Sequence, residues 1–336
     1  MARVFVTGHA GFIGFHLCSL LLDQGHEVFG FDGFTDYYDV KLKEDRHALL
    51  ASRTGFQSAR GLLEDFESLH GAVQSFKPDI FIHLAAQAGV RHSIDEPRGY
   101  ITSNITGFFN VLECCRMHAV RHLLAASTSS VYGGNSVLPY TETDKADLPL
   151  SLYSATKKSN EVMAHSYAHL WKIPTTMFRF FTVYGPWGRP DMALFKFTDA
   201  ILSGRTIDVY NHGNMFRDFT YVSDLVNAIV FLAGTPPSSG NATKLSPADT
   251  LSPVAPHRIV NIGNGGKVKL IDFIHAIETE IGMTAKINFL GMQTGEVPAT
   301  WADNTLLHHL TGYKPKVSLD EGISQFVTWF RNYYRR

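Results

Sequence analysis

The sequence has few cysteines and no long hydrophobic run, and each absence excludes a class of protein. Its three cysteines, Cys18, Cys114 and Cys115, have no metal-ligand spacing, and two adjacent cysteines are poor material for a disulfide framework. Nowhere do about 18 apolar residues follow one another, and a strand-like segment begins at Arg3, which leaves no room for a secretory signal. We therefore expect a cytoplasmic protein in a reducing compartment, without a membrane anchor.

Net charge is nearly absent as well. The 30 Lys and Arg residues face 31 Asp and Glu residues, which gives a formal charge of −1 at pH 7. This balance provides no overall field for nucleic acid or for an acidic membrane, so we expect neither as a partner. An anionic ligand must therefore be bound by local groups. The 336 residues, 45% of them hydrophobic, suffice for one large domain with an annex or for two modest domains.

Short apolar runs alternate with stretches of helical length up to about residue 180. This rhythm predicts parallel strands joined by helical crossovers, and hence an α/β fold. The expected strands are Arg3–Thr7, His26–Phe31, Asp79–Leu84, His122–Ser127 and Thr175–Phe180. Helical patterns occupy residues 12–25, 68–76, 105–118 and 153–171 between them, and 194–204, 270–282 and 319–334 beyond them. Residues 235–257 are polar and without periodicity, and we expect a surface loop there.

Three glycines, Gly8, Gly11 and Gly14, separate the first expected strand from the first expected helix. In dinucleotide-binding folds such glycines permit a tight turn, close approach of the backbone to a pyrophosphate, and close packing of helix on strand. This spacing alone is a weak signal, but the next strand leads to Asp32, placed to accept hydrogen bonds from the adenosine ribose. Because a carboxylate there would repel a 2′-phosphate, we favour NAD over NADP. The alternative is that Asp32 only caps the following turn.

Tyr153 and Lys157 are four residues apart in an expected helix and therefore share one of its faces. A nearby ammonium group lowers the pKa of a phenol, which would allow Tyr153 to act as a base. The alternative is a solvated pair on an exposed helix face. A run of hydroxyl side chains at 127–130 follows an expected strand, at the edge of a parallel sheet where ligands bind, and this favours the catalytic interpretation.

The segments TGHAGFIG, HLAAQAGVRHS, STSSVYG, YSATK and RFFTVYGPWGRPDMA together resemble the extended short-chain dehydrogenase/reductase family, and most of all its UDP-glucuronate 4-epimerases. The similarity covers nearly the whole chain, including DYYDVKLKEDR, RDFTYVSDL and VPATWAD. It implies a Rossmann-type doubly wound parallel sheet with a smaller mixed α/β C-terminal substrate lobe. The NAD-binding domain would comprise residues 1–182, with 219–262 returning to it, and 183–218 and 263–336 would form the lobe.

The resemblance also implies roles for individual residues. Tyr153 would be the base, Lys157 would bond to the nicotinamide ribose, and Thr128 would bond to the sugar O4. NAD would be bound by Gly8, Gly11, Phe12, Ile13, Gly14, Asp32, Leu62, Leu84, Ala85, Ala86, Gln87, Tyr153 and Lys157. A UDP-sugar would be bound by Arg91, Ser129, Ser130, Thr182, Arg189, Arg217 and Gln293.

Two of these arginines match positions with specific partners in the family. Arg217 matches the residue that meets the diphosphate, and Arg189 the residue proposed to meet the uronate carboxylate. The planar guanidinium fork suits both groups, since it binds two oxygens at fixed geometry. The alternative for each is an ordinary exposed arginine.

The implied reaction is the NAD-dependent conversion of UDP-glucuronate to UDP-galacturonate through a transient 4-keto sugar. Hydride leaves C4 for the cofactor while the base takes the proton from O4, which gives the 4-keto sugar. The ketone then turns its other face to the cofactor, and the hydride and the proton return, so there is no net oxidation or reduction. Relatives commonly form homodimers through two helices per subunit, here those carrying ECCRMH and YSATKKSNE, and we expect a homodimer. Epimerisation of another UDP-hexose or UDP-pentose is an alternative.

Three further interpretations remain open: a dehydratase, a decarboxylase and a non-catalytic protein. Dehydratases of this fold carry an Asp-Glu pair after the catalytic threonine, and UDP-glucuronate decarboxylases carry Glu where Ser130 stands; the serines at 129 and 130 disfavour both. A non-catalytic NAD-binding regulatory protein is the alternative from a different class. Its one support is Leu62, which replaces an aspartate that contacts adenine in relatives; His9 and Gly33 are further departures from the family pattern. These departures predict weaker cofactor binding.

For the remaining polar residues of interest we expect structural roles. His165 and His169 have metal-binding spacing on a helix, but no third ligand accompanies them, and we expect no metal. Asn104 is expected to bond across buried backbone near the active centre.

Overall fold

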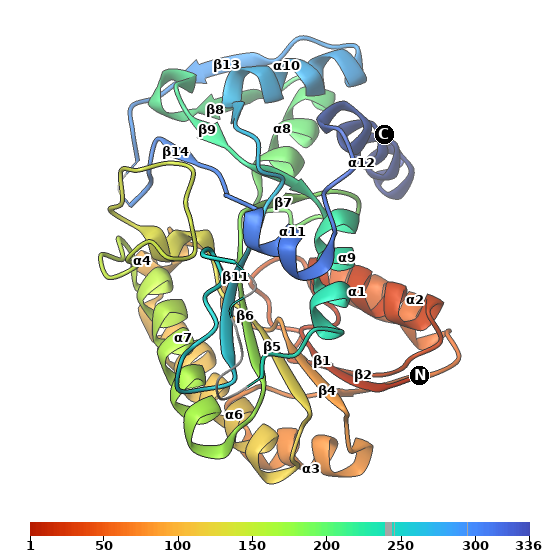
Figure 1. Cartoon of the computed structure of the whole chain (residues 1–336). Coiled ribbons are helices and arrows are strands. Elements are labelled where there is room, and N and C mark those ends of the chain that lie inside the picture. Colours follow the sequence, from red (N-terminus) through yellow and green to blue (C-terminus); the bar gives the residue numbers. More distant parts are fainter. Residues whose placement is uncertain (239–243, 245, 294) are drawn as a thin grey trace.

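A seven-stranded parallel sheet forms the centre of the larger part of the molecule in the computed structural model, which describes residues 1–238, 244, 246–293 and 295–336 (Figure 1). The strand order is β11-β6-β5-β4-β1-β2-β3, so the chain runs from β1 to one edge and then crosses to β4 on the other side of β1. The strands are β1 (Arg3–Thr7), β2 (Glu27–Asp32), β3 (Phe56–Arg60), β4 (Ile80–His83), β5 (His122–Ala126), β6 (Thr175–Phe180) and β11 (His257–Ile262). The predicted α/β class and doubly wound topology are confirmed.

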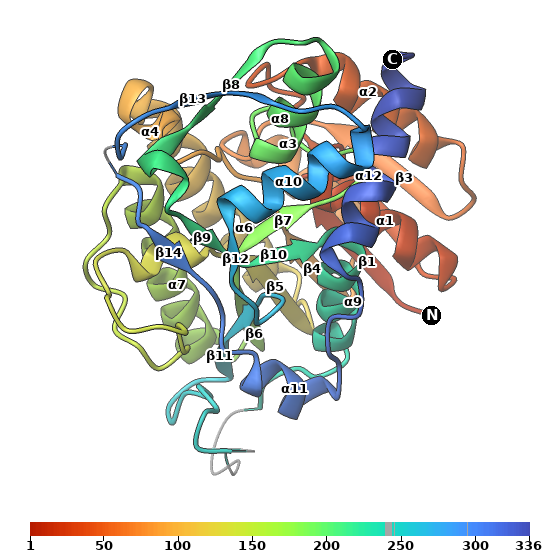
Figure 2. The same ribbon diagram turned by 90° about the horizontal axis from the view of Figure 1, so that it is seen from above.

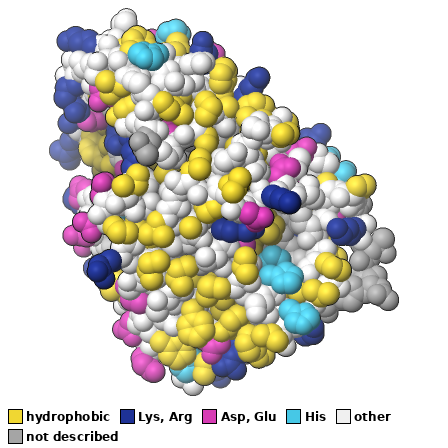
Figure 3. All heavy atoms as spheres, turned by 90° about the vertical axis from the view of Figure 1, so that its left-hand side faces the viewer, with side chains coloured by type: hydrophobic (Ala, Val, Ile, Leu, Met, Phe, Trp, Pro, Cys, Tyr) yellow, Lys and Arg dark blue, Asp and Glu magenta, His cyan; other side chains and the backbone are white. Residues whose placement is uncertain are grey.

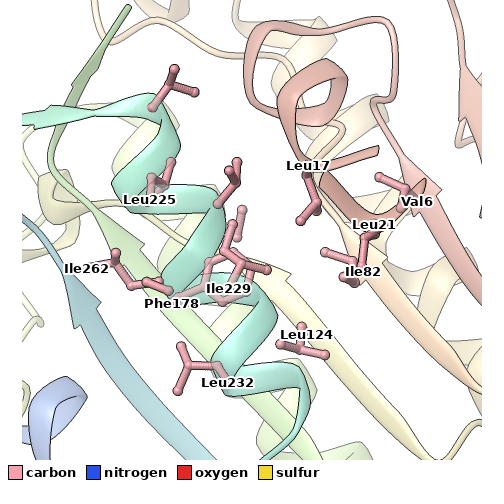
Figure 4. Close-up of a cluster of buried hydrophobic side chains, with 14 of the residues drawn as sticks. Val6, Leu17, Leu21, Ile82, Leu124, Phe178, Leu225, Ile229, Leu232 and Ile262 are labelled. Carbon is pink, nitrogen blue, oxygen red and sulfur yellow. The ribbon is translucent and has the colours of Figure 1, made fainter. Parts of the chain in front are cut away.

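Helices cover both faces of this sheet. One face carries α1 (Phe12–Asp23), α2 (Val40–Ala51), α9 (Val222–Ala233) and α11 (Thr305–Thr311), and the other carries α3 (Phe66–Phe76), α6 (Gly107–Met117) and α7 (Leu152–Trp171). Because side chains alternate along a strand, Val4 and Val6 of β1 pack toward α1, whereas Phe5 packs toward α3. Leu225 and Ile229 of α9 face Leu17 of α1 across the first core (Figure 4). Burial on both faces explains the continuous apolar runs of these strands.

The rest of the chain forms a second layer above the carboxyl edge of the sheet, at the top of Figure 1. Its helices are α8 (Ala193–Leu202), α10 (Leu270–Ile281) and α12 (Leu319–Tyr334). Its strands are β7 (Thr182–Tyr184), β8 (Thr206–Val209), β9 (Phe216–Arg217), β10 (Phe219–Tyr221), β12 (Val268–Lys269), β13 (Lys286–Phe289) and β14 (Ala299–Thr300), which pair as β10-β7, β12-β9-β14 and β13-β8. Figure 2 shows α12 beside α1 and α2, and the Tyr333 hydroxyl donates to Asp45 at 2.5 Å.

Short elements complete the chain. Helices α4 (His92–Asp95) and α5 (Pro97–Tyr100) lead through a π-helical turn at Ile101–Thr106 into α6, and 3-10 turns lie at Ser129–Tyr132 and Tyr210–Gly213. No helix among the described residues combines the length and the apolar character needed to cross a membrane.

Part of the segment expected as a surface loop, 235–257, is not on the surface. Residues 239–243 and 245 lie outside the described residues, but Asp249 and Ala255 are completely buried. Asp249 accepts from Nε of Arg258, and Ser252 bonds to His165 of α7 at 2.8 Å. The polar composition predicts exposure, but Asp249 is buried because its carboxylate is hydrogen-bonded to Arg258. The division of the chain into an NAD-binding domain and a substrate lobe stays a prediction.

Candidate active site

The glycine-rich turn between β1 and α1 is fixed by close backbone packing. Gly8 has φ +80°, and a Cβ there would lie 2.8 Å from the amide nitrogen of Ala85. A Cβ on Gly14 would lie 2.0 Å from the carbonyl oxygen of Gly8, so no larger residue fits. Helix α1 begins at Phe12 with Gly11 as its N-cap and without a side-chain cap. Its first amide groups are therefore available for an anion, as a dinucleotide site requires.

Asp32, the last residue of β2, organises the neighbouring turn. Its carboxylate accepts from the amide of Phe34 at 2.8 Å and from the amide of Ala10 at 3.2 Å. The capping role weighed as the alternative is thus present. The side chain also lines the cavity beside the glycine turn, so both roles are available to the same carboxylate.

One cavity at the carboxyl edge of the sheet brings the candidate cofactor residues together. It is lined by every residue that the resemblance assigned to NAD, namely Gly8, Gly11, Phe12, Ile13, Gly14, Asp32, Leu62, Leu84, Ala85, Ala86, Gln87, Tyr153 and Lys157. Thr128 and Arg189 line it as well. It opens where the strand order reverses on either side of β1, the usual ligand site of doubly wound sheets.

Tyr153 and Lys157 project from the first two turns of α7. The hydroxyl of Ser151 caps this helix by accepting from the amide of Ser154 at 3.1 Å, which fixes where the helix starts. The ring of Tyr100 packs edge-on against Tyr153 with centroids 6.1 Å apart. The ammonium-bearing chain of Lys157 is buried although it reaches the cavity. The solvated-face reading of this pair is therefore wrong.

Burial governs the protonation of both groups. It lowers the pKa of Lys157 to about 8, and the nearby Glu161 carboxylate opposes this effect. It also raises the pKa of Tyr153, while the Thr128 hydroxyl and the charge of Arg189 act in the lowering direction. The expectation that Lys157 lowers the pKa of the phenol is thus not met. Thr128 and Arg189 are the side chains whose interactions favour the phenolate.

A network of buried polar side chains surrounds the segments that carry Thr128 and Tyr153. Ser127 donates to Glu161 at 2.7 Å, and Arg179 binds the same carboxylate through Nε and Nη2, both at 2.8 Å. Thr128 donates to Ser130 at 3.2 Å. Asn104 accepts from the amide of Gln87 and donates to its carbonyl, as expected from the sequence. These bonds fix the carboxyl ends of β4 and β5 around the reactive pair.

The other candidate substrate residues lie outside this cavity or form a second cluster. Arg91 and Arg217 both bind Glu296, at 2.7 Å and 3.3 Å, so the structure brings these two arginines together. Gln293 precedes Glu296 by three residues, and its buried Oε1 has no partner among the described residues. Ser129, Ser130 and Thr182 are not among the residues that line the cavity. Glu296 was not predicted from the sequence, although VPATWAD, part of the resemblance, follows it directly.

The unusual residues of the cofactor region fit one another. Leu62 is 44% exposed, and a Cβ on Gly33 would lie 2.7 Å from its Cδ2. Gly33 therefore makes room for Leu62. His9 is completely buried, and a Cβ on Gly30 would lie 2.4 Å from its Cγ. The imidazole thus packs against β2, and His9 is not among the residues that line the cavity.

Several residues that line the cavity carried no signal in the sequence. They include Thr35, Tyr37, Tyr38, Lys43, Ser103 and Met192. Most come from the segment after β2, where the quoted DYYDVKLKEDR was noted only as part of the resemblance. The described residues contain no group of three or more His, Cys, Asp or Glu side chains arranged to hold a metal. His169 bonds instead to the carbonyl of Val254 at 2.8 Å.

A doubly wound sheet, a glycine turn at a helix N-terminus and a Tyr-Lys pair beside it define a dinucleotide-binding protein of the extended short-chain dehydrogenase/reductase class. A family model described as the NAD dependent epimerase/dehydratase family matches residues 4–246, and the chain belongs to this family.

Its relatives narrow the comparison further. A probable UDP-glucuronate 4-epimerase of Rhizobium meliloti (strain 1021) is 55% identical over 99% of this chain and 98% of its own. UDP-glucuronate 4-epimerase 4 of Arabidopsis thaliana is 42% identical, over 98% of this chain and 76% of its own. The Bacillus cereus UDP-glucuronic acid 4-epimerase, solved with UDP-glucuronic acid and NAD, has a TM-score of 0.87 and 32% identity, covering 99% of this chain and 100% of that one.

Proposed function

We propose that this protein is an NAD-dependent 4-epimerase that interconverts UDP-glucuronate and UDP-galacturonate. One observation carries the proposal: Tyr153, Lys157, Thr128 and Arg189 line the same cavity as the glycine turn and Asp32. This arrangement offers a base, a cofactor site and a carboxylate-binding cation together. The similarity to UDP-glucuronate 4-epimerases over nearly the full chain supports the choice of substrate.

The residues present fit NAD. The turn at Gly8 and Gly14 leaves no room for a Cβ, and the uncapped start of α1 offers amide groups to a pyrophosphate. Asp32 and Lys157 both line the cavity; Asp32 would accept hydrogen bonds from the adenosine ribose, and Lys157 would bond to the nicotinamide ribose. When bound, NAD would supply the hydride acceptor and donor for C4. The remaining chemistry belongs to the protein.

Tyr153 moves the proton. Its phenolate takes the proton from O4 of the sugar and later returns it to O4 on the opposite face, while Thr128 bonds to the same oxygen. Interactions with Thr128 and Arg189 favour the phenolate against the effect of burial. The buried lysine beside it holds a positive charge below its pKa of about 8. Helix α7 and the hydrogen bonds among Ser127, Glu161 and Arg179 hold these groups in position, so they need not rearrange during the reaction.

The carboxylate must survive the reaction. A 4-keto uronate is a β-keto acid and loses CO₂ when its carboxylate turns out of the plane of the ketone. Arg189, which lines the cavity, would hold that carboxylate. Ser129 and Ser130 stand where dehydratases and decarboxylases of this fold carry carboxylates, so no acid-base pair is present there to assist elimination or proton transfer at C5.

The second arginine cluster suits the diphosphate. Arg91 and Arg217 share one carboxylate, that of Glu296, which leaves one positive charge without a counter-ion within the group. Burial lowers the pKa of Arg217, but a guanidinium group remains charged at neutral pH. Gln293 adds an amide to the same region.

We also propose a homodimer formed by α6 and α7. These helices pack side by side on the outside of the sheet, and apolar side chains project outward from them. Figure 3 shows this side of the molecule, where hydrophobic side chains are spread over the lower half. The exposed members are Phe109, Met117, Val162, Leu170 and Trp171. Cytoplasmic location stays a prediction.

The test is to incubate the purified protein with UDP-glucuronate and to follow the sugar ring by proton NMR. The proposal predicts UDP-galacturonate, seen as a small H3–H4 coupling constant. A UDP-pentose would identify a decarboxylase, and binding without turnover would support the non-catalytic alternative. UDP-glucose in a parallel sample distinguishes a uronate enzyme from a general hexose epimerase.

A further inference from the structure

The guanidinium group of Arg189 is already engaged by an aspartate two residues away. Its Nε donates to Oδ1 of Asp191 at 3.0 Å, and its Nη2 donates to Oδ2 at 2.5 Å. This side-on pair uses one edge of the fork. The edge that carries Nη1 is left for a ligand in the cavity that Arg189 lines.

Asp191 also accepts a hydrogen bond from a residue that is distant in the sequence. The hydroxyl of Tyr37, in the segment after β2, donates to Oδ2 of Asp191 at 3.1 Å. The Tyr37 ring packs against His92 with centroids 4.8 Å apart, and the guanidinium of Arg189 lies 5.8 Å from its centroid. A Cβ on Gly89 would lie 2.6 Å from the Tyr37 hydroxyl, so that hydroxyl is closely surrounded. Asp191 is therefore held from two sides.

The backbone next to Arg189 is also hydrogen-bonded to residues on the cofactor side of the cavity. Arg46, which is completely buried, donates to the carbonyl of Trp187 at 2.6 Å and to that of Ala10 at 2.9 Å. His16 of α1 bonds to the carbonyl of Pro186 at 2.8 Å. Since the loop is fixed at two carbonyls, the remaining freedom of Arg189 is in its side chain. Asp191 removes that freedom.

The charges explain why orientation matters at this site. The side chains of Arg189 and Asp191 are 25% and 26% exposed, and together they carry no net charge. The charge of Arg189 lowers the pKa of Asp191 despite burial, so the pair stays ionised at neutral pH. A ligand carboxylate therefore meets a neutral ion pair, and its binding depends on correctly directed N–H groups more than on attraction to a bare cation.

We propose that Tyr37 and Asp191 are positioning residues that make this site select a UDP-uronate over a neutral UDP-hexose. They direct the open edge of Arg189 toward the C6 carboxylate, and neither needs to touch the sugar. The inference rests on the proposed function for the sugar class. It assigns the selectivity to the ion pair and its tyrosine, whereas the resemblance implied only that Arg189 meets the uronate carboxylate.

The test measures dissociation constants of UDP-glucuronate and of UDP-glucose by calorimetry, using the NAD-loaded protein. For the parent, the dissociation constant of UDP-glucose divided by that of UDP-glucuronate gives the selectivity. Tyr37→Phe should reduce this ratio about threefold to tenfold, mainly by weakening UDP-glucuronate, because it removes the anchor of Asp191 and leaves both charges of the ion pair in place. Tyr313→Phe is the matched control, because Tyr313 donates to Asp224 outside the cavity. It should leave the ratio unchanged.

A double variant separates positioning from a general structural effect. If Tyr37 acts through Arg189, adding Tyr37→Phe to Arg189→Ala should not weaken UDP-glucuronate further. Equal weakening of both ligands by Tyr37→Phe, an unchanged ratio, or additive losses in the double variant would overturn the inference. Failure of the parent protein to convert UDP-glucuronate would instead overturn the proposed function, so the two failures are distinguishable.

Discussion

The proposed mechanism depends most on the hydroxyl of Tyr153. Tyr153→Phe removes that oxygen and keeps the ring against Tyr100. Loss of a positioned base typically costs roughly 10²–10⁴-fold in rate, so turnover of UDP-glucuronate should fall by that factor. The dissociation constant of UDP-glucuronate should change little. Rates come from chromatography of the two UDP-uronates, and affinities from calorimetry.

Tyr313→Phe serves as the control for this change too, since it removes a tyrosine hydroxyl outside the cavity. Its turnover should match that of the parent. A Tyr153→Phe variant that turns over at nearly the parent rate would show that another group is the base.

Leu62 offers a second test at the scale of single residues. It lines the cofactor cavity without a hydrogen-bonding group, and it is 44% exposed, so Leu62→Asp introduces an acceptor without burying a charge. A hydrogen bond to the adenine amino group should tighten NAD about threefold to tenfold. Fluorescence titration of the cofactor-free protein measures the change.

The hypoxanthine analogue of NAD is the matched ligand for this variant, because it lacks the amino group. Its affinity should not improve in Leu62→Asp. Equal gains for both dinucleotides, or no gain for NAD, would place adenine away from residue 62.

Local motifs were sufficient to predict part of the site. Gly8, Gly14, Asp32, Tyr153 and Lys157 each lie in a segment whose spacing fixes its geometry, and all line one cavity. The bonds between segments could not be predicted. Tyr37 and Asp191, and Arg217 and Glu296, are joined only by tertiary folding, and a single sequence contains no record of those contacts.

At the scale of elements, five of the six buried strands of the central sheet were predicted; β11, which is also buried, was missed, and so were two more polar elements. The five expected strands are present, and no end differs by more than one residue. β3 was missed because this edge strand has few buried side chains. α2 was missed because its buried face includes Lys43 and Arg46, which break the apolar periodicity that identifies a helix.

The outer surface of α6 and α7 carries the prediction about assembly. Val162 of α7 is 60% exposed in the single chain, and a homodimer through these helices would bury it. Val162→Asp should then place a charge in the interface and raise the dimer dissociation constant about 100-fold or more. Light scattering coupled to gel filtration measures the mass of parent and variant over a concentration series.

Met283→Asp is the control, since Met283 is also exposed but follows α10 and lies outside both helices. It should elute as the parent does. A parent protein that is monomeric at micromolar concentration, or a Val162→Asp variant that stays dimeric, would contradict the proposed interface.

At the scale of the whole molecule, buried neutral histidines make stability depend on pH. Burial lowers the pKa of His9, His16 and His122 to about 4 and that of His257 to about 3, against a usual value near 6.5. Between about pH 6.5 and pH 4 the unfolded chain therefore binds more protons than the folded protein. Stability should rise with pH through this window and be lost as the pH falls.

The magnitude follows from the proton affinities. A tenfold change in proton affinity corresponds to about 1.4 kcal/mol, so each of these histidines should cost on the order of 1–3 kcal/mol of unfolding free energy at pH 4. Urea unfolding at several pH values measures the trend. His257→Leu should reduce the slope, and a stability that does not change between pH 6.5 and pH 4 would contradict the buried neutral state of this group.

The central claim is that the molecule carries out reversible hydride transfer at C4 with no net redox change. The most direct measurement uses UDP-glucuronate with deuterium at C4, converted in ordinary water by the purified protein. The account predicts UDP-galacturonate that retains deuterium at C4, because the hydride that leaves is the one that returns. Product with a solvent-derived proton at C4, or the absence of UDP-galacturonate, would contradict it.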